Sequence, residues 1–397
     1  MPMMWLKGTI WIALGIVVYA YAGYTILLMF LALIKKWLKP FKPATIHETW
    51  PEVTLLVAAY NEKQILDKKV RNIREIDYPA GCLHVVFVTD GSYDVSEQYL
   101  ARYNDITVYH QPERKGKSAA MNRVMPYIHT PYVVFCDANT MLNREAVKEL
   151  IKQFNADNVG CVAGEKKVAM EAVDRAASSG ESIYWHYESF IKKMESEVYS
   201  AVGAAGELYA LRTSLFRPVP EDTILDDFVA SLEVIRQGYI IRYTSHAFSV
   251  EEGSLSMGEE IKRKIRIATG SFQALFRYPR LLNIFSYGFF SFQYFSHKVL
   301  RWAIVPLAIL ILFIFNLAVV VQGGEKIYLV LFILQLFFYG LVFVGYLLRQ
   351  KDIKMRYLFL PYYLISMNAA MVAGFIRYCQ GHYTPAWEKS IRREGRG

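Results

Sequence analysis

The sequence of 397 residues is 54% hydrophobic and 15% aromatic, and only 20% of its residues are charged. This composition excludes a disordered chain and is too apolar for one ordinary soluble domain. The formal net charge of +9 at pH 7 is compatible with nucleic acid binding, but many of the basic residues lie beside long apolar stretches. We therefore interpret the basic excess as a positive-inside signal of a membrane protein and expect no nucleic acid partner.

Four apolar stretches account for the excess of hydrophobic residues. None contains Asp, Glu, Lys or Arg, and each is long enough to cross roughly 30 Å of hydrocarbon as a helix. The first is too long for a removed signal peptide and has no small-residue cleavage site, so we expect a retained anchor. The stretches are Gly8 to Ile34, Ala303 to Gly324, Ile327 to Leu348 and Tyr357 to Ile376.

These stretches predict a multi-pass protein of the inner membrane. Lysines at positions 35, 36, 39 and 42 follow the first stretch, and basic flanks favour the cytoplasmic side, so we expect the large domain in the cytoplasm. The predicted parts are a transmembrane helix at 8–34, a catalytic domain at 43–258, amphipathic interface helices at 259–302, three transmembrane helices within 303–378 and a basic tail at 379–397.

The basic tail conflicts with this topology. One span before the domain and three after it place the tail outside, whereas Lys389, Arg392, Arg393 and Arg396 favour the inside. Three resolutions stay open. The segment from Phe285 to Trp302 has another role, the last apolar stretch is not a span, or the short tail overrides the rule.

The predicted domain has the pattern of an α/β fold. Short runs of β-branched and aromatic residues alternate with helical patterns, which predicts a mostly parallel sheet covered on both faces. Such sheets bind ligands at the carboxyl ends of their strands. The strands are expected at Val53 to Ala59, His84 to Thr89, Ile106 to His110 and Tyr132 to Cys136.

Acids and amides follow three of these strands. Asn61 and Glu62 follow the first strand, Asp90 follows the second, and Asp137 and Asn139 follow the fourth. Any one of them could be an ordinary turn or helix cap. Three such strand ends at one edge of a sheet instead predict a ligand site.

The residue types at these ends suit a nucleotide and a divalent cation. The oxygens of Asp137 and Asn139 suit Mg²⁺ or Mn²⁺, which keeps other positions for water and substrate phosphates. Asp90 and the polar pair after the first strand could accept hydrogen bonds from a base or ribose. The basic run that ends at Lys117 could hold anionic oxygen, or it could be a solvated loop.

Two segments further along the chain suit an acceptor and a base. Small residues such as Gly206, within Gly203 to Arg212, would let another molecule approach the backbone, or would simply pack tightly. Asp226 and Asp227 stand at a predicted helix start, where one is expected to cap the helix. The other could be a general base, because its neighbour and partial burial raise its proton affinity.

Arg263 and Arg266 share one face of a predicted helix through Glu259 to Thr269. This face is either a stripe on the membrane surface or a clamp for a leaving diphosphate. The two roles are compatible if the helix lies at the membrane interface.

The order of these motifs, their spacing and the membrane context resemble membrane-embedded family 2 glycosyltransferases of the GT-A fold. This group contains the cellulose, chitin, hyaluronan and poly-N-acetylglucosamine synthases. The resemblance runs from about Val53 to the C-terminus. It implies that Asp90 binds the nucleoside and that Gly203 to Arg212 is the acceptor segment. It also implies that Asp137 and Asn139 form the metal-binding DxD motif, with Asn in place of the second Asp.

The resemblance also implies roles for the carboxylate pair and the arginines. Asp226 and Asp227 match the acid pair of the family, whose second residue is the base, so Asp227 is the expected catalytic base. The QxxRW motif of processive synthases aligns with Arg263 to Ile267, where Arg263 replaces Gln and Ile267 replaces Trp. Arg266 remains as the expected diphosphate contact, whereas loss of the Trp, which stacks near the acceptor sugar, argues against repeated addition.

What the resemblance implies is a metal-dependent, inverting transfer from a nucleotide sugar, with uridine suggested, to a hydroxyl of a growing polysaccharide. A single-sugar transferase that acts on a lipid or lipid-linked acceptor stays open. So does a transporter or receptor with a sensor domain, although the four stretches carry no ionisable residue for a substrate path. Membrane lipids are further expected partners, and an accessory subunit stays open.

Overall fold

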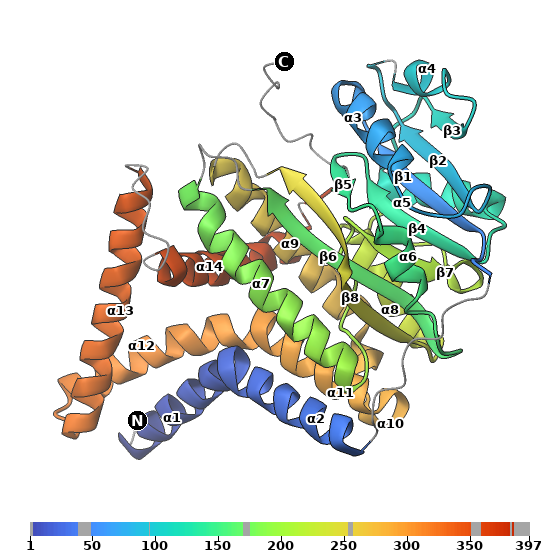
Figure 1. Cartoon of the computed structure of the whole chain (residues 1–397). Helices are drawn as coiled ribbons and strands as arrows, with labels where there is room; N and C mark the ends of the chain where they lie inside the picture. Colours follow the sequence, from blue (N-terminus) through green and yellow to red (C-terminus); the bar gives the residue numbers. More distant parts are fainter. Residues whose placement is uncertain are drawn as a thin grey trace. The chain divides into compact units, whose positions relative to one another are not determined.

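The chain forms two compact units. In the computed structural model the described residues are 3–38, 49–94, 96–169, 175–252, 257–350, 359–381 and 383–384. Figure 1 shows the strands of one unit and the long helices of the other. We call them the sheet unit, which comprises 34–171, 187–256 and 383–397, and the helical unit, which comprises 1–33, 172–186 and 257–382.

A mixed sheet of eight strands lies at the centre of the sheet unit, counted over the described residues. The order is β3-β2-β1-β4-β7-β6-β8-β5. The pairings β1–β2, β1–β4, β2–β3 and β6–β8 are parallel, and β6 and β8 lie side by side in Figure 1. The pairings β4–β7, β6–β7 and β5–β8 are antiparallel. The strands are β1 (Val53–Ala59), β2 (Leu83–Asp90), β3 (Ile106–Gln111), β4 (Tyr132–Asp137), β5 (Thr140–Leu142), β6 (Val159–Ala169), β7 (Tyr209–Arg212) and β8 (Ile240–Glu252).

The chain reverses its direction of winding at β1. Strands β2 and β3 are added on one side of β1, and β4 is then added on the other side. This creates a topological switch point at the carboxyl ends of β1 and β4, which is where open α/β sheets bind ligands. The register places Asp137 of β4 opposite Ala58 of β1, while Thr89, the residue before Asp90, lies opposite Ala59.

The helices of the sheet unit bury apolar faces against the strands. Helix α3 buries Leu66, Val70 and Ile73, whose spacing of four and three residues places them on one helix face. They join a core that contains Leu55 of β1 and Phe87 of β2. These elements are α3 (Lys63–Arg74), α4 (Ser96–Leu100), α5 (Lys117–Val124), η2 (Met125–Tyr127), α6 (Ala146–Ile151), η3 (Thr213–Leu215) and α8 (Asp226–Arg236).

The helical unit contains two helix pairs with tight apolar contacts. Leu6 and Ile10 of α1 pack with Val319 of α12, and Phe272 of α9 packs with Met371 of α14. The N-terminal helix bends at the π-helical segment η1 (Figure 1). The elements are α1 (Met3–Val18), η1 (Tyr19–Gly23), α2 (Tyr24–Leu38), α9 (Met257–Arg277), η4 (Pro279–Leu282), α10 (Ile284–Tyr287), α11 (Phe289–Tyr294), η5 (Phe295–Ile304), α12 (Val305–Val321), α13 (Lys326–Gln350) and α14 (Phe359–Cys379), together with α7 (Arg175–Val198), which continues into the sheet unit.

Three helical stretches are long and apolar enough to cross a membrane, within the part of the chain that the structure describes. They are Met3–Leu38, Phe289–Val321 and Lys326–Leu348. The first and third apolar stretches of the sequence fall within them, and the second does so except for its last three residues. The fourth forms α14, which is not among the three, so its role as a span stays a prediction.

The second of these stretches begins earlier than the sequence suggests. It includes α11 and the π-helical segment η5, which were expected to be interface helices. The domain boundaries inferred from the sequence also stay predictions. Residues 39–48 and most of the predicted basic tail, from 385 onward, lie outside the described residues.

Candidate active site

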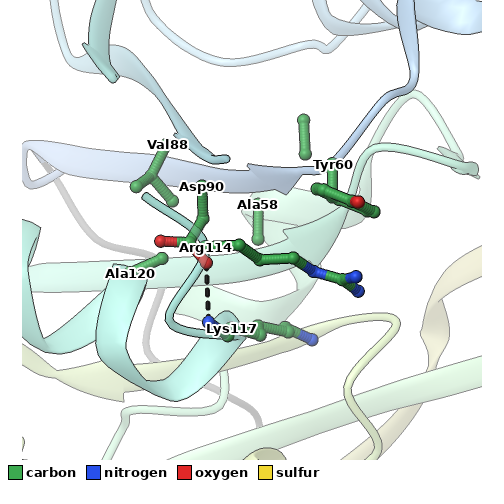
Figure 2. Close-up of a pocket in the computed structure, with 9 residues that line it drawn as sticks. Ala58, Tyr60, Val88, Asp90, Arg114, Lys117 and Ala120 are labelled. Carbon is green, nitrogen blue, oxygen red and sulfur yellow. Dashed lines mark hydrogen bonds between the residues drawn. The ribbon is translucent and has the colours of Figure 1, made fainter. Parts of the chain in front are cut away.

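A pocket with about 380 Å³ of empty space opens at the carboxyl ends of β1 and β2 (Figure 2). Ala58 of β1 and Val88 of β2 are small enough to leave this space free. The Arg114 guanidinium lies 3.9 Å from the centre of the Tyr60 ring and forms one wall. The remaining lining residues are Ala59, Asp90, Gly116, Lys117 and Ala120.

Asp90 fixes the turn that precedes α5. Its Oδ2 accepts hydrogen bonds from the backbone N–H groups of Lys115, at 2.8 Å, and Gly116, at 2.6 Å, and Figure 2 shows it against this turn. Gly116 has a φ of 96°, which glycine adopts without strain. The carboxylate predicted to bind the nucleoside therefore also determines where the first residue of α5, Lys117, projects.

Lys117 brings the other predicted acids together. Its Nζ lies 2.7 Å from Asp137 Oδ1, at the end of β4, and 3.4 Å from Asp226 Oδ2, at the start of α8. Burial alone would lower the pKa of Lys117, but Asp137, Asp226 and Asp227 outweigh it and raise the pKa well above its usual value. The ammonium group is therefore charged throughout the physiological range.

The Asp227 carboxyl has a pKa near neutrality. Burial first, and then the negative charges of Asp226 and Glu207, raise its pKa to about 7, although Lys117 acts in the opposite direction. A Cβ atom placed on Gly206 would lie 3.1 Å from Asp227 Oδ2, so the absence of a side chain there keeps one side of the carboxyl open. A general base is most effective when its pKa lies near the working pH.

The predicted metal ligands fit a divalent cation. Asp137 is buried, and the buried Oδ1 of Asn139 accepts no hydrogen bond from the residues that the structure describes, which leaves this oxygen available to a ligand. No group of three His, Cys, Asp or Glu side chains suited to a metal occurs among the residues that the structure describes. A carboxylate and an amide oxygen are hard ligands, which suit Mg²⁺ or Mn²⁺ that completes its shell with water and phosphate oxygens.

The predicted residues Asn61 and Glu62 lie in the loop between β1 and α3. Asn61 has a φ of 53°, which Asn tolerates better than most residues. Its Oδ1 accepts a hydrogen bond from Tyr93 N at 2.9 Å, so it ties the loop after β1 to the loop after β2. Glu62 precedes the first residue of α3.

Arg263 and Arg266 belong to α9 of the helical unit. Arg263 pairs with Glu260 of the same helix, with 3.0 Å between Nε and Oε2. The prediction that these arginines contact a diphosphate stays a prediction.

Sequence reasoning missed four residues that belong to the cluster or adjoin it. Buried Tyr209 stacks on Phe135 with 4.8 Å between ring centres, and its hydroxyl has no hydrogen-bond partner in the structure. Glu207 and Tyr209 fall in the small-residue segment, which was noted for its glycines and alanines only. The other two, Lys166 and Glu251, lie on β6 and β8, which were not predicted.

Comparisons with known proteins show what the chain is similar to. Residues 54–217 match the family described as Glycosyl transferase family 2. The chain is 24% identical over 235 residues to a poly-beta-1,6-N-acetyl-D-glucosamine synthase of Staphylococcus aureus, covering 57% of this chain and 56% of that protein. It is also 24% identical over 245 residues to a beta-monoglucosyldiacylglycerol synthase of Trichormus variabilis, covering 58% of this chain and 51% of that one. The chain thus spans only about half the length of these curated relatives.

A solved structure shares the fold over nearly the whole chain. It is a mannosyltransferase from Pyrobaculum calidifontis in complex with GDP-mannose and Mn²⁺, with a TM-score of 0.67 and 22% identity. The match covers 94% of this chain and all of that one. The α/β fold predicted from the sequence is therefore confirmed as GT-A-like.

Proposed function

We propose that this chain, whose residues 54–217 form a family 2 glycosyltransferase domain, transfers a sugar with inversion from a nucleotide sugar to a hydroxyl of a growing polysaccharide. One observation carries the proposal. Carboxylates from the end of β4 and the start of α8, namely Asp137 and Asp226, meet on the ammonium group of Lys117 beside a pocket that could hold a nucleotide.

Asp227 is proposed as the catalytic base. It takes the proton of the acceptor hydroxyl while the acceptor oxygen forms a bond to the anomeric carbon. The bond from that carbon to the diphosphate oxygen breaks on the opposite face, and its electron pair leaves with the nucleoside diphosphate. Gly206 leaves room for the acceptor beside the Asp227 carboxyl.

The leaving diphosphate is expected to lie next to Lys117. Asp137 and Asn139 would hold Mg²⁺ or Mn²⁺, which supplies Lewis-acid stabilisation of the leaving group when bound. The ammonium group of Lys117 adds a fixed positive charge where negative charge develops. Arg266, with Arg263 beside it, is proposed as a further contact to the diphosphate.

The nucleoside is assigned to the pocket beside Tyr60. The Tyr60 ring and the Arg114 guanidinium offer flat surfaces for a base. Asp90 could meet the base with Oδ1, which the turn does not use and which lies 3.5 Å from Arg123 Nη1, and Asn61 and Glu62 follow the end of β1. A uridine nucleotide is proposed as the donor.

The apolar helices support a location at a membrane. We place the reaction at the cytoplasmic face of the cell membrane, because lysines follow the first span. A lipid acceptor is the second candidate. It is favoured by the glucosyldiacylglycerol synthase among the relatives and by Ile267 at the position of the Trp in QxxRW.

The test uses the full chain purified in detergent and a panel of sugar nucleotides. Release of nucleoside diphosphate is measured with and without Mn²⁺, and the product is sized. Asp227→Asn is expected to lower turnover by about 10²–10⁴-fold, the usual contribution of a general base, while donor binding persists. A ladder of products supports polymer synthesis, and one shifted lipid spot supports the second candidate.

Glu221→Gln serves as the matched control, because Glu221 is an exposed acid shortly before α8, the helix that carries Asp227. Its turnover is expected to equal that of the unaltered chain. Normal turnover in Asp227→Asn would remove the base assignment, and no release from any sugar nucleotide would remove the enzyme assignment.

A further inference from the structure

Lys166 is a buried cation that joins two acids from different strands and loops. The residue is 6% exposed and lies on β6. Its Nζ lies 2.6 Å from Glu251 Oε2, on β8, and also contacts Glu207 Oε1, two residues before β7. We call Lys166, Glu207 and Glu251 the lysine bridge.

One arm of the bridge leads to a proposed metal ligand. The second oxygen of Glu251, Oε1, accepts a hydrogen bond of 3.1 Å from Asn139 Nδ2. Because this bond fixes the direction of the amide nitrogen, it also fixes the direction of Asn139 Oδ1, the buried oxygen without a hydrogen-bond partner.

The other arm leads to the proposed base. Glu207 follows Gly206, which lies against the Asp227 carboxyl. Its carbonyl oxygen accepts a hydrogen bond of 3.4 Å from Thr140 Oγ1, which also donates to the carbonyl of Asp137 at 3.0 Å. Both arms therefore start at the same ammonium group, and one ends at Asn139 while the other ends at Gly206, beside Asp227.

We propose that Lys166 is a positioning residue that, through Glu251 and Glu207, holds the Asn139 oxygen and the Gly206 backbone at a fixed separation. This inference rests on the proposed function. Desolvating three charged groups is costly, and apolar residues of similar size often stabilise a fold equally well. A bridge whose arms reach the metal side and the base side of one site is better explained by orientation, because groups around metal ligands set ligand direction.

The first test compares Lys166→Met with Lys166→Arg in the full chain. Binding of Mn²⁺ is measured without turnover, by electron paramagnetic resonance, with Mn²⁺ alone and with added UDP or GDP. Lys166→Met is expected to weaken Mn²⁺ binding in the presence of nucleotide by about tenfold or more, as is typical when a partner of a metal ligand is lost. It is also expected to lower kcat more than it raises the donor KM, and Lys166→Arg should recover part of both.

Lys167→Met is the matched control, because Lys167 is the neighbouring residue of β6 with a side chain that is 45% exposed. It should leave Mn²⁺ binding and turnover unchanged. If the unaltered chain binds Mn²⁺ with neither nucleotide, the proposed function itself is contradicted. If the unaltered chain binds Mn²⁺ and Lys166→Met binds it equally well, only the positioning role is contradicted.

A charge exchange keeps the inference testable if Lys166→Met fails to fold. In Asn139→Asp a carboxylate would face the Glu251 carboxylate, so Mn²⁺ binding should weaken although the metal gains a charged ligand. Adding Glu251→Gln restores a donor opposite position 139, and binding should recover to at least the level of the unaltered chain. A double variant no better than Asn139→Asp would show that Glu251 does not orient this ligand, and the inference would be abandoned.

Discussion

The proton on Asp227 is expected to set the pH dependence of the reaction. With a pKa raised to about 7, the carboxyl is ionised above this pH and protonated below it. A base must be ionised to accept a proton, so log kcat/KM of the full chain should rise with a slope of about one below pH 7 and level off above it. The measurement is a pH profile of nucleoside diphosphate release. Asp226→Asn removes the largest electrostatic cause of the shift and should move the inflection to lower pH; an unmoved inflection would show that another group titrates.

The same shift has a consequence for stability. Because the pKa of Asp227 in the folded state lies above the ordinary value of 3.8, the folded state binds more protons than the unfolded state between these two pH values. The free energy of unfolding therefore falls as pH rises through this window, and the penalty is complete above pH 7. Asp227→Asn should raise the melting temperature more at pH about 8 than at pH about 5. An equal gain at both values would contradict the raised pKa.

Lys117 is expected to oppose cation binding while it assists the donor. Its ammonium group contacts Asp137, a proposed metal ligand, at 2.7 Å. Lys117→Met should therefore tighten binding of Mn²⁺ alone, since the competing cation is gone, but raise the KM for the donor, about tenfold, through loss of a charge-assisted contact. Lys115→Met is the control, because Lys115 is half-exposed and pairs with Glu113 at 3.7 Å. If Lys117→Met weakened the binding of both Mn²⁺ and the donor, or strengthened both, Lys117 would not both oppose the cation and assist the donor.

At the residue scale, the members of the site that could be predicted are those that follow the carboxyl ends of strands. Asp90 and Asp137 follow parallel strands, and the carboxyl ends of such strands meet at one edge. The lysine bridge gives no such signal. Lys166 is far from Glu251 in the sequence, and a charged residue in a strand normally indicates a solvated face. Only the pairing of β6 with β8 reveals that this lysine is buried between acids.

At the element scale, the loop before β7 depends on glycine for its path over α8. Gly203 has a φ of 87°, and a Cβ atom there would lie 2.3 Å from Cδ2 of Phe228. Gly203→Ala should cost about 1 kcal/mol of backbone strain and a further 1–3 kcal/mol of overpacking. Thermal unfolding measures the loss. Gly81→Ala is the control, because its φ of 80° is similar but nothing lies within 4 Å, so it should show the strain alone. Equal losses would mean that Phe228 moves aside freely.

The elements that the sequence predicts correctly are those with a clear pattern of apolar residues. Strands β1 to β4 are continuous apolar runs and appear where the sequence places them, within one residue. Strand β6 was missed because Gly160 and Gly164 interrupt it and charges follow, although both glycines are required by neighbours that leave no room for a side chain. The π-helical turns of η1 and η5 cannot be read from an apolar pattern, which does not distinguish them from α-helix.

At the scale of the whole molecule, the number of spans determines the side on which the chain ends. Hydropathy predicts four spans, yet α14 packs along α9, where a Cβ atom on Gly374 would lie 2.4 Å from Cβ of Ala268. Hydropathy does not distinguish an apolar helix of this length that faces lipid from one that packs against another helix. Three spans place the end of α14 on the same side of the membrane as the sheet unit, and four place it on the opposite side. The basic tail favours the first arrangement.

Cys379, the last residue of α14, is exposed and reports this side directly. In Cys82→Ser the two cysteines other than Cys379 are buried, and burial raises the pKa of the Cys136 and Cys161 thiols, which makes them poor nucleophiles. A membrane-impermeant maleimide is added either to intact cells or to inverted vesicles. If the chain has three spans, Cys379 should be labelled in the same one of these two preparations as Lys115→Cys, a reporter on the sheet unit. Gln322→Cys, in the turn after α12, should be labelled in the other preparation. Both reporters would carry Cys379→Ser. Labelling of Cys379 together with Gln322→Cys would establish α14 as a fourth span and leave the basic tail as an exception to the positive-inside rule.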